Sequence, residues 1–599
     1  MTASTDTADA RPWGAFPQAD GGTLFRLWAP DAPPGMTLHV EGHAALPTVP
    51  DGEGYAEWHV ADCGPGTRYH YELADGTRLA DPASRLQDGD IHDESIVMGP
   101  SSYEWHHPEW QPRVWEESVL YEVHVGLAGG FQGLRARLPE LAALGINLIE
   151  LMPIADFPGP RNWGYDGVLA YAPDRAYGSP HELQELIDSA HCLGIGVILD
   201  VVYNHFGPDG NGLPRYAGRF FREDRTTPWG PAIDFREPAV RRYFEDSAIH
   251  WLEEFRFDGL RLDAVHAIVD EDWLRALPRR LRARLPGRRI HLVIEDDANR
   301  ASLLDGDYDA QWNDDLHHVL HHLLTGEDHG YYGDYRQDAG RILARCLAEG
   351  WYYQGQPSEH HGGAPRGEPS GHLPPSAFIF FLQNHDQIGN RAWGERLSVL
   401  VRQPERLRAA IALQMLAPMV PLLFMGEEYA SRAPFLYFTS HTDPALVQAV
   451  RDGRAREFAN QPGFGESNNG IPDPNAETSY SACAPWPENG AHHEWTAFYA
   501  RLLDLRAYFL GLRLAHTWSK GAECLGPAAA LASWQLGDGA ELRVYVNLAP
   551  DACAVSPQAR PDDLQPWVLI FETSAGALAS VLDGQLPGHC TVWVTRETP

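Results

Sequence analysis

The sequence lacks any apolar run long enough to cross a membrane. None of its 599 residues lies in a stretch of 18 or more apolar residues. The first fifteen residues are polar and acidic, without the basic start and apolar stretch of a secretory signal. These absences argue against a helical membrane protein or a secreted one, and we expect a cytoplasmic location.

Cysteine is scarce as well. The seven cysteines are odd in number and scattered, and no two of them form a C-x-x-C pair. A disulfide framework would show an even number at close spacing. We therefore expect reduced, mostly buried thiols.

Basic residues are outnumbered by acidic ones. The chain has 47 Lys and Arg against 82 Asp and Glu, which gives a formal net charge of -35. Such a charge repels nucleic acid phosphates and anionic lipid surfaces, so we expect neither nucleic acid nor a membrane as a partner. The 44% of apolar residues is ordinary for a soluble globular protein, and the length favours two or three domains.

The pattern of the chain changes twice. Residues 1–100 contain short alternating segments between Gly, Pro and Asp turns, which predicts an N-terminal β-sandwich. Residues 113–513 alternate apolar strands with amphipathic helices, and residues 514–599 return to short β-like segments that predict a C-terminal β-sandwich. The middle region predicts an α/β fold, a (β/α)8 barrel, with strands at 118–125, 146–152, 197–202, 259–263, 290–294, 309–312, 378–382 and 422–425.

Two helices between these strands have clear ends. Leu134, Leu138, Leu141 and Leu144 fall at helical spacing and stop at Gly145. A second helix begins at residue 179 with Ser, then Pro at the first position and Glu at the third, a capping-box pattern.

Polar residues follow several of the predicted strands at the point where each strand ends. The third strand ends in Asp200 and is followed by His205, the fourth ends in Asp263, the fifth is followed by Glu295, and the seventh by Asp386. Catalytic residues of a β/α barrel lie at these carboxyl ends. Strand alternation also directs Arg261 and Asp263 to the same side, into the barrel.

Three carboxylates on one rim would repel each other. We expect Arg261 to keep Asp263 ionised, as a nucleophile requires. We expect Glu295, in an acidic neighbourhood, to have a raised pKa suited to proton donation. This is the division of labour between two carboxylates in glycoside hydrolysis.

These segments, in this order, resemble the four signature regions of the α-amylase superfamily of glycoside hydrolases. Within it, residues 162–168, 309–315, 383–391 and 434–439 are similar to the maltooligosyltrehalose trehalohydrolase family. The segment 126–132 departs from that family in being shorter than its loop after the first strand. The resemblance implies a cofactor-independent enzyme acting on α-glucans.

The resemblance also implies roles for single residues. Asp263 is then the nucleophile, Glu295 the acid/base, and Asp386 the carboxylate that holds sugar hydroxyls where the ring distorts. The remaining implied roles are stacking under that ring for Tyr165, hydroxyl binding for His205 and His385, and ordering of the site for Asp200 and Arg261.

Several residues keep two interpretations. His266 either faces the leaving-group sugars or is a buried, satisfied histidine. Trp163 and Trp229 are sugar platforms or core residues, and Asp200 and Asn204 are as well explained by a structural role. Glu427 and Glu428 either line the acceptor side or cap the following segment.

One group of histidines has metal-ligand spacing. His317 with His321, and His318 with His322, are two i, i+4 pairs. No Asp, Glu or Cys ligand accompanies them in the pattern, so we favour a solvated helix face and predict no metal site.

The sequence thus predicts a retaining hydrolase that cleaves the α-1,4 bond next to a terminal trehalose unit through a covalent intermediate on Asp263. The alternatives are a branching or debranching enzyme acting on α-1,6 bonds, and a non-catalytic glucan-binding scaffold. In a scaffold we would expect one of the three carboxylates to be replaced, and none is. The sequence carries no indication of an oligomeric state.

Overall fold

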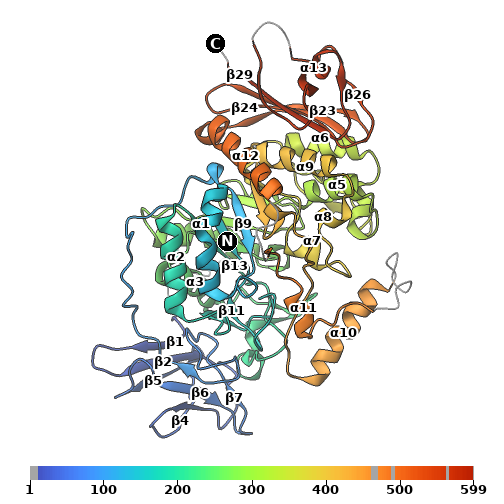
Figure 1. The fold of residues 1–599 in the computed structure, drawn as a ribbon. Helices are drawn as coiled ribbons and strands as arrows, with labels where there is room; N and C mark the ends of the chain where they lie inside the picture. Colours follow the sequence, from blue (N-terminus) through green and yellow to red (C-terminus); the bar gives the residue numbers. More distant parts are fainter. Residues whose placement is uncertain (1–10, 460–469, 488–492, 562–565, 598–599) are drawn as a thin grey trace, which may run out of the picture.

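A closed barrel of eight parallel strands forms the centre of the protein (Figure 1). The computed structural model describes residues 11–459, 470–487, 493–561 and 566–597. The barrel strands are β9 (Leu120–Val123), β10 (Leu148–Leu151), β13 (Gly196–Val201), β16 (Gly259–Leu262), β17 (His291–Ile294), β18 (Ala310–Trp312), β21 (Phe378–Phe381) and β22 (Val420–Phe424). Each overlaps a range predicted from the sequence, so the predicted (β/α)8 fold is confirmed.

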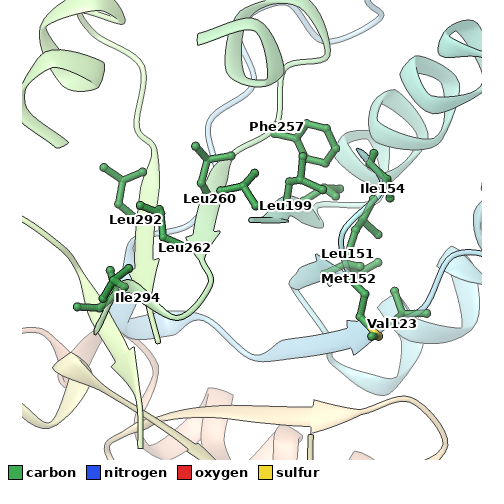
Figure 2. Packing of buried hydrophobic residues seen from close by; sticks show 14 of the residues in the cluster. Val123, Leu151, Met152, Ile154, Leu199, Phe257, Leu260, Leu262, Leu292 and Ile294 are labelled. Atoms are coloured by element: carbon green, nitrogen blue, oxygen red, sulfur yellow. The ribbon is translucent and has the colours of Figure 1, made fainter. Parts of the chain in front are cut away.

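Strand alternation separates the barrel interior from the layer beneath the helices. Ten strand residues with Trp115 form an interior apolar cluster, and it includes Leu120, Leu148, Ile198 and Val293. The intervening residues pack outward; Figure 2 shows Leu199, Leu260 and Leu292 of this outer layer on neighbouring strands. Inward-facing side chains recur at every second residue of a strand. The inward position that follows the last interior apolar residue therefore lies at the carboxyl-terminal rim of the barrel.

The register between neighbouring barrel strands places the residues of the carboxyl-terminal rim at the same height along the barrel axis. Asp200 of β13 lies opposite Arg261 of β16, and Leu262 of β16 lies opposite Ile294 of β17. Because the strands are parallel, the residues that follow them emerge at one end of the barrel.

Helices surround the barrel. The larger ones are α1 (Gly130–Leu144), α2 (Pro180–Cys192), α3 (Pro238–Glu254), α4 (Glu271–Arg284), α5 (Asp314–Thr325), α6 (Ala339–Glu349), α9 (Pro404–Leu416) and α12 (His493–Phe509). The predicted capping box is confirmed, since Ser179 and Glu182 each accept a backbone hydrogen bond from the other. The predicted end of α1 is also confirmed, because Gly145 has a φ of 105°, which favours glycine.

Further elements lie in the loops of the barrel. They are the hairpins β11 (Ala155–Asp156) with β12 (Leu169–Pro173), β14 (Phe221–Thr227) with β15 (Gly230–Ile233), and β19 (Gln356–Pro357) with β20 (Pro365–Arg366), and the helices α7 (His385–Gly389), α8 (Leu397–Leu400), α10 (Pro444–Phe458) and α11 (Glu477–Ser481). Of these, α10 stands apart from the ring of helices in Figure 1.

Two small sheets form the N-terminal part. One contains β1 (Gly14–Pro17), β2 (Thr23–Trp28) and β5 (Tyr55–Val60); the other contains β4 (Leu46–Pro47), β3 (Thr37–Val40), β6 (Arg68–Glu72) and β7 (Arg78–Leu79), with β8 (Ser95–Ile96) paired to β6. Ring contacts between Phe25 and Tyr69 and between Trp58 and Tyr71 join the two sheets in an apolar core.

The C-terminal part is a five-stranded antiparallel sheet. It contains β23 (Trp518–Gly526), β24 (Ala529–Gln535), β25 (Glu541–Asn547), β29 (Cys590–Arg596) and β27 (Val568–Glu572), accompanied by β26 (Cys553–Ala554), β28 (Gln585–Leu586) and α13 (Ala577–Leu582). The domain boundaries at 100, 113 and 513 stay a prediction.

Two expectations about the whole chain concern cysteines and membrane spans. All seven cysteines are free thiols, and Cys63, Cys346, Cys483 and Cys590 are buried. Among the described residues, no helix combines the length and the apolar character that a membrane crossing requires.

Candidate active site

Arg261 joins three of the predicted site carboxylates. Its side chain is fully buried, and its guanidinium lies 4.1 Å from the centre of the Trp312 ring. Nη1 donates hydrogen bonds to Asp200 Oδ2 (2.7 Å) and Asp263 Oδ1 (2.9 Å), and Nη2 donates to Glu295 Oε2 (2.7 Å). One cation therefore holds carboxylates from three neighbouring strands in fixed positions.

The expected division of charge between Asp263 and Glu295 is wrong for the free protein. Burial raises the pKa of Asp263 well above its usual range, and this outweighs the attraction of Arg261. Burial also acts on Glu295, but Arg261, His266 and a hydrogen bond from the backbone N–H of Ala264 (3.1 Å) together lower its pKa. The sequence pattern placed Arg261 beside Asp263 alone, whereas the guanidinium is shared with Glu295.

The residue after Asp263 has an unusual backbone conformation. Ala264 has a φ of 41°, in the left-handed region that residues other than glycine rarely adopt. Such strain persists where the surrounding structure fixes it, and it is concentrated at functional sites. Here it orients the Ala264 N–H toward Glu295.

Tyr165 and His385 form one wall of the site. Their rings stack with centroids 4.9 Å apart and planes at 21°, and the Tyr165 hydroxyl donates to Asp200. His385 Nδ1 donates to Glu122, whose other oxygen accepts the His385 backbone N–H at 3.2 Å. Burial lowers the pKa of His385, but Asp386 and Glu122 more than compensate and raise it to about 9.

Sequence reasoning missed two buried glutamates below the rim. Glu122 and Glu150 lie opposite each other in the β9–β10 pairing, and each comes two residues after an interior leucine. Neither carboxylate oxygen of Glu150 has a hydrogen-bond partner among the described residues, and burial and the neighbouring Glu122 raise its pKa well above its usual range. The alternation of inward and outward side chains, which indicated Arg261 and Asp263 from the sequence, also predicts that Glu122 and Glu150 face the barrel interior.

A cavity of about 480 Å³ opens above these residues. Asp263, Glu295 and Asp386 all line it, so the structure brings the three predicted catalytic carboxylates together. The Asp386 side chain is 34% exposed, compared with 8% for Asp263. Of the predicted binding residues, Tyr165, His205, Trp229, His266 and His385 line the cavity, whereas Asp200 and Arg261 lie beneath it.

Trp229 and His266 form an open edge of the cavity. The Trp229 side chain follows β14, is 45% exposed and stacks on His205, with centroids 4.9 Å apart and planes at 11°. His205 is held in turn by the Tyr165 carbonyl at 3.0 Å. His266 is exposed, so the core interpretation of Trp229 and the buried interpretation of His266 are both wrong.

Trp163 is mostly a packing residue. It is buried, its Nε1 donates to the Leu436 carbonyl at 2.9 Å, and its ring stacks on Phe435 at 5.3 Å. It also lines the cavity, so it connects the motif at 162–168 with the motif at 434–439.

The histidine cluster on α5 is not a solvated face. His317, His318 and His321 are buried, and burial lowers the pKa of each below its usual range. His318 stacks on Tyr331 with ring centroids 4.3 Å apart, and His321 stacks on Tyr332 at 4.2 Å. The segment that follows α5 folds back over this face, which helical spacing alone does not reveal.

Glu427 and Glu428 do not line the cavity with their carboxylates. Glu427 accepts the Phe424 N–H at 3.1 Å, and Glu428 accepts the Tyr121 hydroxyl at 2.7 Å. Burial raises their pKa values to about 8 and about 7. The interpretation of these residues as acceptor contacts is therefore wrong, and their hydrogen bonds fix the end of β22.

Helix α10 supplies cavity residues that the sequence did not indicate. Arg454 and Glu457 line the cavity together with Asn390 and Tyr437. Arg454 Nη2 donates to the Gly389 carbonyl at 2.8 Å, and its guanidinium lies 5.2 Å from the centre of the Tyr437 ring. Arg454 thus ties α10 to residues of the 383–391 and 434–439 motifs.

A row of polar groups runs from the seventh strand toward the sixth. The Tyr331 hydroxyl donates to Gln387 Oε1 at 3.0 Å, and Gln387 Nε2 donates to Asp314 Oδ1 at 3.4 Å. Burial and the charge of Glu295 raise the pKa of Asp314 well above its usual range. Asp315 next to it is structural, since its carboxylate is paired with Arg366 at 2.6 Å.

Two family models match the chain. The model for the alpha amylase catalytic domain matches residues 84–212, and a domain of unknown function (DUF3459) matches residues 517–593. Among solved structures, a putative alpha amylase from Salmonella typhimurium has a TM-score of 0.89 at 38% identity, covering 98% of this chain and 99% of that one. A pullulanase from Paenibacillus barengoltzii, at 21% identity and a TM-score of 0.70, shares the fold.

Curated relatives are more specific. The malto-oligosyltrehalose trehalohydrolase of Deinococcus radiodurans is 40% identical over 82% of this chain and 82% of its own length. The enzyme of the same name from Saccharolobus solfataricus is 38% identical over 73% of this chain and 79% of its own length. A 1,4-alpha-glucan branching enzyme from Bordetella pertussis is 35% identical but covers only 46% of this chain. The extent and identity of these matches show that the chain belongs to the malto-oligosyltrehalose trehalohydrolase family of α-amylase-type glycoside hydrolases.

Proposed function

We propose that this protein hydrolyses the α-1,4 bond next to the terminal trehalose unit of maltooligosyltrehalose, releasing trehalose. The observation that supports this most directly is the arrangement at Arg261: two carboxylates share its guanidinium and face one cavity with a third, in a chain of the trehalohydrolase family. No cofactor takes part in the proposed reaction.

In the proposed reaction, an Asp263 oxygen attacks the anomeric carbon while Glu295 gives its proton to the glycosidic oxygen, so that the trehalose leaves as an alcohol. Glu295 then removes a proton from water, whose oxygen displaces Asp263 from the sugar. Two inversions give retention of configuration. The shared guanidinium supports this geometry, because it holds both carboxylates close to each other.

Glu295 must be protonated before it can act as an acid. In the free protein, Arg261 and the Ala264 N–H favour its ionised form. We infer that a bound sugar displaces the Glu295–Arg261 hydrogen bond and excludes water. Burial then raises the pKa of Glu295, which takes up a proton. Arg261, no longer shared with Glu295, favours the ionised form of Asp263, which gives up its proton and becomes the nucleophile.

The remaining cavity residues fit sugar binding. Tyr165 offers a flat ring beside Asp263, Asp386 has an open carboxylate for vicinal hydroxyls, and the cationic His385 donates to oxygen. Asp200 and Arg261 position Tyr165 and the two central carboxylates from below. His205 fixes the Trp229 platform.

The leaving group lies on the side of Glu295 in this proposal. His266 and Trp229 line the cavity there. The row of Tyr331, Gln387 and Asp314 lies outside the lining residues, and we place it on the same side because the charge of Asp314, like that of His266, interacts with the charge of Glu295. A trehalose unit offers hydroxyls to this row.

The test of this function is a comparison of products. Incubation with maltooligosyltrehalose, amylose and a branched glucan, each separately, should give trehalose from the first at the highest rate. Cleavage or formation of α-1,6 branches without trehalose would support a branching or debranching enzyme. Absence of hydrolysis in all three would favour a glucan-binding scaffold. A cytoplasmic location is part of this proposal, and the seven free cysteines fit a reducing compartment.

A further inference from the structure

Two histidines and a glutamate gather on the N-terminal sheet, outside the cavity of the candidate active site. His39 of β3 lies directly opposite His70 in the antiparallel pairing with β6, and Glu72 is two residues further along β6. Side chains of a strand alternate between its faces, so these three share the face opposite Tyr69 and Tyr71, which pack in the core. One possible ligand atom from each lies within 4.8 Å of the others.

His70 is already arranged as a metal ligand. The residue is only 7% exposed, and its Nδ1 lies 3.1 Å from Glu94 Oε1, so the ring proton sits on Nδ1 and Nε2 carries a free lone pair. Nε2 has no hydrogen-bond partner among the described residues. Buried polar atoms nearly always have a partner, and a carboxylate on the second ring nitrogen is typical of metal-binding histidines.

The other two groups face this lone pair. Glu72 Oε2 lies 3.8 Å from His70 Nε2, and Glu72 Oε1 lies 3.8 Å from His39 Nε2. The two imidazole rings are stacked, with centroids 4.9 Å apart and planes at 7°. Ligand atoms around a tetrahedral metal with bonds of about 2.0–2.1 Å are roughly 3.4 Å apart, so the rings must tilt toward each other. His39 Nε2 lies 3.0 Å from Thr37 Oγ1, so the partly exposed His39 must leave this hydrogen bond to bind a metal. Glu72 is also partly exposed and can rotate, whereas Glu94 holds His70.

The charges around the cluster are compatible with a cation. Two carboxylates lie beside His70: Glu72 Oε2 is 3.8 Å from Nε2, and Glu94 Oε1 is 3.1 Å from Nδ1. Two cations lie nearby. Arg68, two residues before His70 on β6, is paired with Asp88 at 2.8 Å, and the Nε of Arg78 lies 4.0 Å from Glu72 Oε2 with the Arg78 side chain 64% exposed. Arg78 can therefore turn toward solvent when a metal takes its place.

We propose that His39, His70 and Glu72 form a site for one Zn²⁺ ion that links β3 to β6. Two imidazole nitrogens and one carboxylate oxygen are a donor set that zinc accepts, whereas Ca²⁺ and Mg²⁺ prefer oxygen ligands. Water fills the fourth position. Because the site joins adjacent strands of a small sheet away from the cavity, the ion stabilises the N-terminal fold and takes no part in catalysis.

The first test is a calorimetric titration of the full-length protein, stripped with EDTA, with ZnCl2. We expect one zinc ion to bind per chain and to raise the unfolding temperature, with no comparable effect of CaCl2 or MgCl2. His39→Gln should abolish this binding and leave the unfolding temperature without zinc nearly unchanged, because His39 is partly exposed. His43→Gln is the matched control: His43 is an exposed histidine just after β3 and should leave binding intact.

The second test addresses how His70 is held. Glu94→Gln should keep the stoichiometry and lower the affinity about 10–100-fold, since it removes the carboxylate that orients the ring. Bound Co²⁺ should give the intense visible absorption of a tetrahedral site, and His39→Gln should abolish it. Zinc affinity that is the same in His39→Gln and the unmodified protein, or no saturable binding at all, would overturn the proposal.

Discussion

Arg261 Nη2 lies 2.7 Å from Glu295 Oε2, while Nη1 of the same guanidinium lies 2.9 Å from Asp263 Oδ1. The proposed acid and the proposed nucleophile therefore share one counter-ion in the free protein. Catalysis requires Glu295 to be protonated and Asp263 to be ionised, whereas the pKa shifts of the free protein favour the reverse. In our proposal the entering sugar reverses this order by separating Glu295 from Arg261.

The first prediction concerns these two carboxylates. Asp263→Asn and Glu295→Gln should each lower kcat by at least about a thousandfold, since one removes the nucleophile and the other the proton donor. Azide should partly restore turnover to Glu295→Ala by attacking the glycosyl-enzyme. Circular dichroism and thermal unfolding would verify that the variants fold; near-normal turnover of either folded variant would refute the assignment.

Retention of configuration is the second prediction. Carboxyl groups roughly 5 Å apart allow one of them to attack the sugar directly, whereas inverting enzymes need roughly 6.5–9.5 Å to admit water. Two groups held by one guanidinium fit the closer spacing. NMR of the fresh reducing sugar should show the α-anomer first, and an initial β-anomer would exclude the covalent intermediate.

The third prediction is a loss of stability at alkaline pH. His385 has a pKa raised to about 9, above the ordinary value of about 6.5, so its charge stabilises the folded state fully below pH 6.5. This contribution, on the order of 3 kcal/mol, is lost as the pH rises through about 9. Glu122→Gln should move the loss to lower pH. Thermal unfolding between pH 6 and about 10 measures it, and identical profiles would contradict the role of Glu122.

Glu122 and Glu150 should respond differently to the same replacement, which is the fourth prediction. Burial and the charge of Glu122 raise the pKa of Glu150 well above its usual range and favour its uncharged form. Glu150→Gln should therefore change kcat by less than about threefold. Glu122→Gln removes the charge that faces His385 and replaces one of the two oxygens that accept from it with a donor. It should lower kcat/KM by tenfold or more, because hydrogen bonds to charged groups contribute about 1.5–3 kcal/mol. Equal losses of activity in the two variants would contradict the prediction that Glu150 acts as an uncharged group.

The barrel and its rim were predictable because both follow from alternation along single strands. The inward positions of β13 and β17 change from apolar, at Ile198 and Val293, to charged at the rim. The same change occurs on β9 and β10 at Glu122 and Glu150. The division of charge at Arg261 was not predictable, because it depends on distances between strands. The position of α10 was not predictable either, since it depends on the hydrogen bond from Arg454 to the Gly389 carbonyl.

The histidines of α5 show a further limit of sequence patterns. Their spacing indicates only that they share one face of the helix. Tyr331 and Tyr332 pack on that face and shield it from solvent. The same packing places the Tyr331 hydroxyl beside Gln387. Tyr331 thus covers His318 and also contributes its hydroxyl to the row on the proposed leaving-group side.

The fifth prediction concerns that side. The protein should prefer maltotriosyltrehalose over maltopentaose of equal length by on the order of a hundredfold or more in kcat/KM. Each polar group of the site that trehalose satisfies and maltose leaves unpaired costs about 1–3 kcal/mol, and two such groups give this factor. Equal kcat/KM values for the two substrates would exclude a site matched to trehalose.

The Tyr331–Gln387–Asp314 row locates this preference. Tyr331→Phe removes the hydroxyl that orients Gln387, at 3.0 Å, and should reduce the preference for maltotriosyltrehalose about tenfold while changing kcat/KM for maltopentaose much less. Tyr103→Phe is the matched control, because that hydroxyl donates to Asp188 of α2 at 2.9 Å and takes no part in the row. Direct quantification of trehalose distinguishes cleavage of maltotriosyltrehalose from cleavage of maltopentaose. If Tyr331→Phe lowered both values by the same factor, the row would support the fold of the site and would not recognise the leaving group.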